Sequence, residues 1–330
     1  MSREAVERLE SEIEKSEGDL RLLREQMSRV LVGQHGLRDG LLRALLCDGH
    51  VLVEGVPGLA KTLAASTLAS CLNASFTRIQ FTPDLLPADL TGTMIFQPDT
   101  GKFTTRRGPV FSQMILADEI NRAPAKVQSA LLEAMQERQV TIGGRTHPLP
   151  RPFYVMATQN PIEQEGTYPL PEAQVDRFLL KLIVDYPTAD EERKILSRMG
   201  GHEKPEAEKV LEPERVVELQ LLVDGVVVED SLVDYMVRLV EATRFPAQAG
   251  LSELEDLISY GASPRATLAL QAASRASALM AGQAFVTPEQ VKAVAHEVLR
   301  HRIIRSFEAE AEEVGVEEII DTVLDRVPVR

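Results

Sequence analysis

The sequence predicts an α/β fold with a parallel sheet, followed by a smaller helical region. Short apolar runs of strand length alternate with helical patterns, at Val51–Val53, Phe76–Phe81, Met114–Ala117, Phe153–Ala157 and Phe178–Val184. Short, continuously apolar strands separated by helices are typical of a parallel sheet that is buried on both faces. After Pro187 the pattern becomes mainly helical, which predicts a second and smaller domain.

Helical patterns define the rest of the chain. Residues 1–29 predict an amphipathic helix, and Leu37–Leu46, Lys61–Leu72 and Ala125–Arg138 predict three more. In the second half, Ser263 and Pro264 mark the start of a helix over Arg265–Leu279, and Thr287, Pro288 and Gln290 form a capping box before Val291–Leu299. We therefore expect three parts: an N-terminal helix over 1–29, an α/β domain over 30–187 and a helical domain over 188–330.

Composition and charge restrict the class of partner. The 330 residues include 44% hydrophobic and 26% charged residues, which indicates a folded globular protein long enough for two domains. The formal net charge is −14. Because phosphate neutralisation supplies most of the affinity for nucleic acid, this acidic balance disfavours a nucleic-acid partner. The segment 307–325 carries eight acidic residues and no basic one, which predicts a solvated helical face.

The sequence contains no targeting or membrane-spanning signal. The N-terminus lacks the apolar core of a signal peptide, and no run approaches the roughly 20 apolar residues that span a bilayer. Cys47 and Cys71 form no CxxC pair and are expected to be reduced thiols. His296 and His301 lie five residues apart, on different faces of a helix, so they do not form a zinc-protease motif. We expect a cytoplasmic protein without membrane insertion.

A glycine-containing loop follows the first predicted strand and opens a helix. Its sequence is Gly55-Val56-Pro57-Gly58-Leu59-Ala60-Lys61-Thr62. In this context the backbone N–H groups can surround phosphate oxygens, the Lys61 ammonium can reach the β- and γ-phosphates, and the Thr62 hydroxyl can hold Mg²⁺. Ala60 departs from the general pattern, which has glycine before the lysine. The sequence therefore predicts an ATP site built from Gly55, Val56, Pro57, Gly58, Leu59, Ala60, Lys61, Thr62 and Leu63.

Two acidic residues follow another apolar strand. Asp118 and Glu119 come directly after Met114–Ala117, at the strand end where open α/β sheets bind their ligands. An acidic pair at a strand end is common by itself, but it follows the phosphate loop by about 60 residues, as expected in P-loop NTPases. We expect Asp118 to bind Mg²⁺ with Thr62, and Glu119 to orient the attacking water.

Two further polar residues remain ambiguous from the residues alone. Asn160 follows the apolar strand Phe153–Ala157 and can either contact the γ-phosphate or the attacking water, or begin a turn with Pro161. Arg177 can be a surface charge, a partner of Asp176, or a residue that stabilises transition-state charge in a neighbouring subunit.

Two segments alternate around turn residues and predict hairpins. The first covers 94–105 and turns at Asp99–Gly101, and the second covers 139–147 and turns at Gly143-Gly144.

The motifs GVPGLAKT, MILADEIN, VMATQNP and LPEAQVDRF resemble those of the MoxR family of AAA+ ATPases. The resemblance extends from Val32-Gly33-Gln34 to Ser263-Pro264-Arg265. It implies a three-layer αβα P-loop NTPase domain with a parallel sheet, followed by a small all-α lid domain. Alanine at the position of Ala60 is usual in that family.

The same resemblance implies roles for the remaining site residues. Asn160 matches the sensor 1 residue, Arg177 the arginine finger, and Arg265 the sensor 2 arginine. By itself Arg265 is an unfavourable cation at a positive helix end, which is consistent with a phosphate partner. Gly33 and Gln34 match the segment that packs near the adenine.

The resemblance also implies partners and activity. The hairpins resemble those of the helix-2-insert clade, where they line a pore or face partners. We expect ATP and Mg²⁺ as ligands, a homo-oligomeric ring (a hexamer in the family), and chaperone-like remodelling of a protein client that has a von Willebrand factor A domain. A metal-chelatase subunit, a nucleic-acid motor and a nucleotide-dependent binding switch with negligible turnover are the alternatives.

Overall fold

The computed structural model describes residues 3–161, 166–201 and 204–329, with the side chains of the first helix described from residue 7. Its contacts divide the chain into two units. The α/β unit comprises residues 21–178 and 182–218, and the helical unit comprises residues 1–20, 179–181 and 219–330. We keep the sequence-based division at residues 29 and 187 as a proposal.

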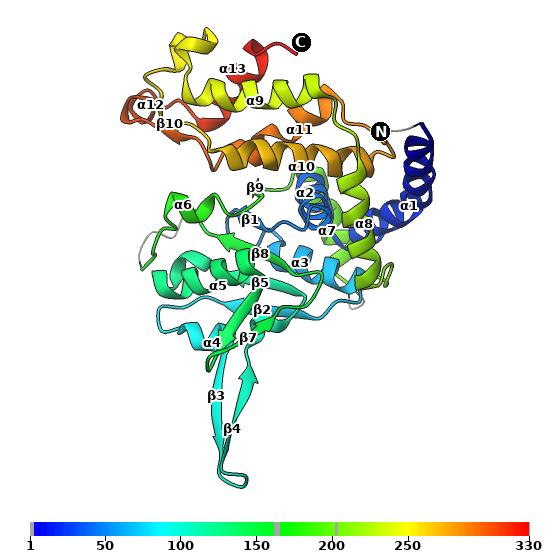
Figure 1. Cartoon of the computed structure of the whole chain (residues 1–330), viewed down its shortest axis with the longest axis vertical. Helices are drawn as coiled ribbons and strands as arrows, with labels where there is room; N and C mark the ends of the chain where they lie inside the picture. The colour runs from blue at the N-terminus through cyan, green and yellow to red at the C-terminus, as the bar shows by residue number, and fades with distance from the viewer. Residues whose placement is uncertain (1–2, 162–165, 202–203, 330) are drawn as a thin grey trace. The chain divides into compact units, whose positions relative to one another are not determined.

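A five-stranded sheet forms the centre of the α/β fold (Figure 1). Its order is β2-β5-β8-β1-β9, with β1 at Val51–Glu54, β2 at Phe76–Gln80, β5 at Met114–Asp118, β8 at Tyr154–Gln159 and β9 at Leu180–Ile183. The neighbours β2/β5, β5/β8 and β8/β1 pair in parallel. All five predicted strands are present, and their ends differ from the prediction by at most two residues because strand ends carry mixed apolar and polar residues.

Helices cover both faces of this sheet. On one face, α5 (Ala125–Glu137) packs through Val127 and Leu131 into a buried cluster that contains Ile115 of β5. Side chains alternate along a strand, so Tyr154 of β8 faces the other side, where its hydroxyl donates to the Leu41 carbonyl of α2 (His35–Leu46) at 3.2 Å. Helix α3 (Lys61–Cys71) packs against β5. These layers confirm the predicted three-layer αβα fold.

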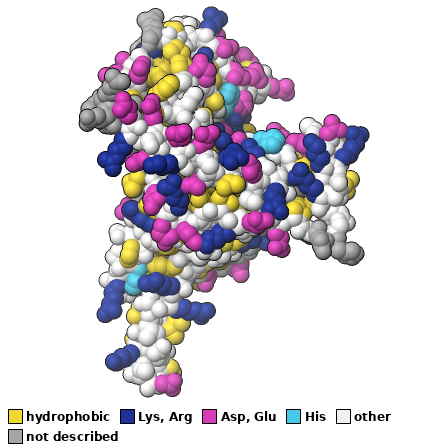
Figure 2. All heavy atoms as spheres, turned by 90° about the vertical axis from the view of Figure 1, so that its right-hand side faces the viewer, with side chains coloured by type: hydrophobic (Ala, Val, Ile, Leu, Met, Phe, Trp, Pro, Cys, Tyr) yellow, Lys and Arg dark blue, Asp and Glu magenta, His cyan; other side chains and the backbone are white. Residues whose placement is uncertain are grey.

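Two hairpins extend from the α/β unit at the predicted places. In Figure 1 the first, β3 (Gly92–Gln97) with β4 (Lys102–Arg107), projects beyond the sheet, and the second pairs β6 (Gln139–Ile142) with β7 (Arg145–Pro148). Figure 2 shows Lys and Arg side chains along the projecting hairpin, where Lys102, Arg106 and Arg107 are exposed together with Phe96 and Phe103. A chain of net charge −14 therefore carries a basic and aromatic protrusion.

Short elements complete the α/β unit. They are α4 (Pro87–Thr91), η1 (Pro109–Phe111), η2 (Ile120–Arg122), α6 (Glu172–Val175) and α7 (Ala189–Met199). Thr188 caps α7, since its Oγ1 accepts from the Glu191 N–H and the Glu191 carboxylate accepts from the Thr188 N–H.

The helical unit is mostly α-helical, as predicted. Its elements are α9 (Asp230–Arg244), η3 (Ala247–Ala249), η4 (Ser252–Leu254), β10 (Ile258–Tyr260), α10 (Pro264–Met280), α11 (Pro288–Leu299), β11 (Ile304–Arg305), α12 (Phe307–Ala311) and α13 (Val316–Arg326). Two helices, α1 (Arg3–Val30) and α8 (Pro213–Gly225), each have residues in both units. The antiparallel pair β10–β11 was not predicted, because strands of three and two residues leave no readable alternation. Helix α10 packs against α9 and α11.

Other helical predictions are confirmed in detail. Leu9, Ile13, Leu20, Leu23 and Met27 of α1 are all buried. The acidic residues of 307–325 are exposed, apart from the partly buried Glu317, while α13 buries Ile319, Ile320, Val323 and Leu324. Within the described ranges, none of the helices has both the length and the apolarity needed to cross a bilayer.

His50 provides a stability test of the α/β core. It is buried, its Nδ1 accepts from the Val155 N–H at 3.1 Å, and its Nε2 lies 3.2 Å from the Met135 carbonyl. Burial, helped by the Arg138 charge, lowers the pKa of His50 from 6.5 to about 3. The folded chain therefore keeps His50 neutral, while the unfolded chain binds a proton below pH 6.5.

We expect the free energy of unfolding to fall as the pH drops from 6.5 towards 3. At pH 4.5 this single group should cost about 3 kcal/mol relative to pH 7. Urea unfolding at pH 7 and pH 4.5 measures this loss of unfolding free energy. The His50→Gln protein has no titrating group at this position, so its loss should be smaller by about 3 kcal/mol. Equal losses in both proteins would contradict a neutral, buried His50.

Candidate functional site

The three motif segments meet at one edge of the sheet. Strand β8 lies between β5 and β1, with Ala157 opposite Ala117 and Gln159 opposite Glu54. Directly beyond β1, the Gly55 N–H donates to the Gln159 carbonyl at 3.4 Å. Because parallel strands end at the same edge, the phosphate loop, the Asp118–Glu119 pair and Asn160 are brought together there.

The phosphate loop connects β1 to α3 in a strained conformation. Ala60, the residue before Lys61, has φ 58°, in the left-handed region that costs an L-residue roughly 1–2 kcal/mol. Gly55 is required for another reason, because a Cβ at that position would lie 2.8 Å from the Val184 carbonyl oxygen. Such strain in a loop before a helix is typical of a ligand-binding segment.

Lys61 is half-buried and faces its own loop. Its Nζ donates to the Gly55 carbonyl oxygen. Burial lowers the pKa of Lys61, while the carboxylates of Asp118, Glu119 and Glu54 act in the opposite direction. The ammonium is therefore within electrostatic reach of both acids, and it can exchange its carbonyl contact for a phosphate oxygen.

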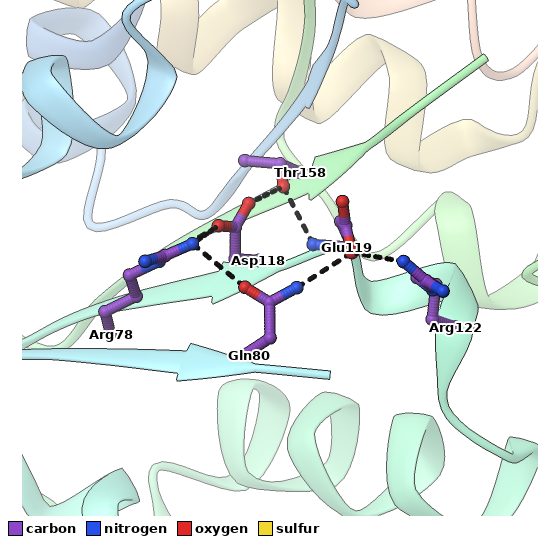
Figure 3. Close-up of polar contacts among 6 residues, drawn as sticks. All are labelled: Arg78, Gln80, Asp118, Glu119, Arg122 and Thr158. Atoms are coloured by element: carbon purple, nitrogen blue, oxygen red, sulfur yellow. Dashed lines mark hydrogen bonds and ion pairs between the residues drawn. The ribbon is translucent and has the colours of Figure 1, made fainter. Parts of the chain in front are cut away.

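Asp118 is a buried carboxylate with a partner on each oxygen (Figure 3). The Thr158 hydroxyl of β8 donates to Oδ1 at 2.6 Å. Arg78 of β2 donates to Oδ2 from Nη2 at 2.6 Å and from Nε at 3.0 Å. A buried carboxylate is stable only with such compensation, so this position is built to hold positive charge.

Glu119 lies next to Asp118 in an unusual backbone conformation. Its φ is 55°, and its N–H donates to the Thr158 hydroxyl oxygen at 2.9 Å. Its Oε2 accepts from Gln80 Nε2 at 2.8 Å and from Arg122 Nη1 at 3.2 Å (Figure 3). The two carboxylates therefore have different side-chain partners, Arg78 and Thr158 for Asp118, and Gln80 and Arg122 for Glu119.

An apolar pocket of about 130 Å³ lies beside the phosphate loop. The Gln34 amide donates to the Asp185 carbonyl at 3.0 Å, and Gly33, at φ 67°, lies against the Glu191 side chain. These contacts hold the segment 30–34 against the segment that leads into α7. The pocket is lined by Val30, Leu31, Val32, Gln34, Gly58, Leu59, Ala60, Leu63, Pro187, Ile195 and Met199. Its lining suits a flat, mostly apolar ring such as a nucleobase.

The remaining predicted residues lie in different settings. Asn160 is buried at the end of β8. Arg177 is exposed after α6 and lines a separate groove of about 560 Å³ together with Glu133 and Glu137 of α5. Arg265 belongs to the helical unit, where it is exposed in the first turn of α10 and its N–H donates to the Ser263 hydroxyl oxygen at 3.2 Å.

Sequence reasoning missed several residues of this site. Arg78, Gln80 and Arg122 were assigned no role, and Thr158 was noted only as part of a strand motif. One signal was available: Arg78 and Gln80 alternate with Thr77 and Ile79 along β2, which places both polar side chains on the same face. The role of these side chains can be inferred only once β2 is known to pair with β5, which carries Asp118.

The residues present fit Mg²⁺. Thr62 and Asp118 offer hydroxyl and carboxylate oxygens, the donors that this ion prefers. The Asp118 carboxylate already balances a cationic group in the structure. Its environment therefore suits a cation at the phosphate end of the site.

Comparisons with known proteins agree with this geometry. Residues 50–180 match the family model of the ATPase family associated with various cellular activities (AAA), and residues 252–323 match the AAA lid domain. Chaperone MoxR1 of Mycobacterium tuberculosis is 52% identical over 302 residues, which cover 92% of this chain and 80% of the relative. Protein MoxR of Paracoccus denitrificans is 34% identical over 320 residues, with 92% and 94% covered.

A solved structure shows the same fold along almost the whole chain. The crystal structure of a candidate ATPase from Cytophaga hutchinsonii superposes with a TM-score of 0.92 at 47% identity, covering 97% of this chain and 98% of the other. The fold, the phosphate-loop edge and these matches define an AAA-type ATPase, which binds and hydrolyses ATP. Within that class, the chain belongs to the MoxR family. AAA proteins are usually oligomeric.

Proposed function

We propose that this ATPase hydrolyses ATP at the interfaces of a homo-oligomeric ring, a hexamer, and uses the energy for chaperone-like remodelling or maturation of a protein client. The observation that carries the proposal is the meeting of Lys61, Asp118 and Glu119 at one sheet edge. The relative named Chaperone MoxR1, 52% identical, supports the chaperone-like role.

In the proposed mechanism the phosphate loop holds the nucleotide. The backbone N–H groups of Gly55–Leu63, to which Pro57 contributes none, surround the phosphates together with the ammonium of Lys61. The base occupies the apolar pocket beside Gly33 and Gln34. Thr62 and Asp118 would hold Mg²⁺, which would supply positive charge to neutralise the charge that develops on the phosphates. Holding the nucleotide requires Lys61 to leave the Gly55 carbonyl.

The acidic and amide side chains of the edge prepare the attacking water. Glu119 polarises this water, and Asn160 aligns it with the γ-phosphate. The backbone of Glu119 is fixed by its N–H contact with Thr158, which also contacts Asp118. Thr158 therefore fixes the Asp118 carboxylate and the Glu119 backbone relative to each other.

Two arginines stabilise the charge that develops on the γ-phosphate. Arg177 acts on the nucleotide of the neighbouring subunit, which its exposed position after α6 makes possible. Arg265, at the start of α10, senses the γ-phosphate from the lid. The Arg177 role makes each active site a shared one.

The client and the location form the remainder of the proposal. We propose that the client contacts the β3–β4 hairpin, which exposes basic and aromatic side chains. From the family resemblance, we propose that the client has a von Willebrand factor A domain. We also propose a cytoplasmic location, as expected from the sequence.

The test is ATP hydrolysis per subunit measured against protein concentration. A site shared between subunits predicts that specific activity rises with concentration and then reaches a plateau when rings are complete. Light scattering on the same samples reports the assembly, and the two midpoints should coincide. Specific activity that does not change while the oligomer dissociates would contradict interface catalysis.

A further inference from the structure

Arg78 occupies the oxygen of Asp118 that faces β2. Nη2 and Nε of its guanidinium converge on the single oxygen Oδ2, while Oδ1 is taken by the Thr158 hydroxyl (Figure 3). Hydrogen bonds between ionised groups are about twice as strong as neutral ones. The guanidinium thus provides positive charge in direct contact with the buried Asp118 carboxylate.

The strand that carries Arg78 allows its side chain to leave. β2 is the last strand of the sheet, and its register places Arg78 opposite Leu116, two residues before Asp118. The Arg78 side chain is 50% exposed, against 12% for that of Asp118. A rotation towards solvent therefore breaks side-chain contacts only, and the ladder between β2 and β5 stays intact.

A metal ion at Asp118 would compete with Arg78 for the same carboxylate. Two cations on one carboxylate repel each other, and the repulsion is strong in a partly buried site. From this geometry we infer that Arg78 is a resident counter-ion of Asp118, which Mg²⁺ must displace when nucleotide binds. The inference rests on the proposed assignment of Asp118 to Mg²⁺.

Displacement has a measurable consequence for metal affinity. Mg²⁺ must compete with the Arg78–Asp118 contact, so the contact raises the Mg²⁺ concentration needed for metal-dependent nucleotide binding. A second contact holds Arg78 in place, because its Nη2 also donates to Gln80 Oε1 at 2.9 Å. Removing the guanidinium should therefore favour the metal-bound state.

The experiment measures ADP binding to the full chain over a series of buffered free Mg²⁺ concentrations, so that turnover plays no part. In Arg78→Gln the midpoint of the Mg²⁺ response should fall about tenfold. Arg78→Lys keeps a charge but loses the two converging donors, and should shift the midpoint by about threefold. The matched control is Arg193→Gln, which removes an exposed arginine paired with Asp190 and should leave the midpoint unchanged.

The outcomes separate this inference from the proposed function. An unchanged or raised midpoint in Arg78→Gln, with a melting temperature near that of the wild type, would overturn the inference. If Arg78→Gln does not fold, the Arg78→Lys shift decides in the same way. Loss of the Mg²⁺ response in Asp118→Asn supports the metal assignment on which both depend. If Asp118→Asn keeps the wild-type response, or the wild type binds no ADP, the proposed function itself fails.

Discussion

Arg177→Ala is expected to lower ATP turnover by about 10³–10⁵-fold while nucleotide binding is retained. The side chain is exposed after α6 and lines a groove with Glu133 and Glu137, apart from the apolar pocket beside the phosphate loop. Its removal should therefore leave the subunit's own cradle intact and remove transition-state charge stabilisation from the next subunit. Turnover and ADP affinity, measured on the same preparation, test both parts.

Mixing variants tests whether Arg177 acts between subunits. Lys61→Ala lacks the phosphate-binding lysine but keeps Arg177, so a mixture with Arg177→Ala re-creates interfaces that have both groups. Random assembly at equal amounts gives intact pairs at about a quarter of head-to-tail interfaces, and activity should recover towards that share. Arg193→Ala, a surface variant, should behave as wild type. No recovery at any ratio would count against action in trans.

The sequence was sufficient for those parts of the site that are local in the chain. The strand before Gly55, the loop and the helix after Lys61 are contiguous, so apolar run, glycines and helix start can be read together. The same holds for Met114–Asp118, where four apolar residues precede the acid in a strand buried throughout. Local patterns of this kind also predicted both hairpins.

The partners of the carboxylates could not be predicted, because they depend on strand order. Arg78 and Gln80 lie about 40 residues before Asp118 and Glu119, and only the pairing of β2 with β5 brings them together. Thr158 reaches both acids because β8 lies on the other side of β5. Short apolar runs predict that a sheet exists but carry no information about which strands are neighbours.

The apolar pocket beside the phosphate loop was predicted only in part for the same reason. Gly33 and Gln34 were assigned to it through a family motif, whereas Pro187, Ile195 and Met199 were not. Those three residues approach the phosphate loop because Gln34 contacts Asp185 and Gly33 contacts Glu191, which are tertiary contacts between segments some 150 residues apart. In sequence they read only as the start of another helix.

Glu119→Gln is expected to lower turnover by about 10²–10⁴-fold with ATP binding unchanged or tighter. The amide keeps the size of the carboxylate, and the backbone N–H contact with Thr158 does not depend on the side chain. What is lost is the negative charge that polarises the attacking water. Single-turnover hydrolysis measured beside equilibrium ATP binding separates the chemical step from affinity.

The contacts of Glu119 also predict how the variant should differ from Asp118→Asn. Glu119 Oε2 accepts from Gln80 and Arg122, and a glutamine amide keeps an oxygen that can accept from them. The Glu119→Gln protein should therefore bind Mg²⁺ and nucleotide as the wild type does. Asp118→Asn should instead raise the Mg²⁺ requirement. Glu25→Gln, in an exposed ion pair with Arg21, is the control for loss of a carboxylate. Equal, slow hydrolysis by wild type and Glu119→Gln would favour a nucleotide-dependent binding switch. In that case removing the Glu119 charge would not change the rate, so Glu119 would take no part in hydrolysis.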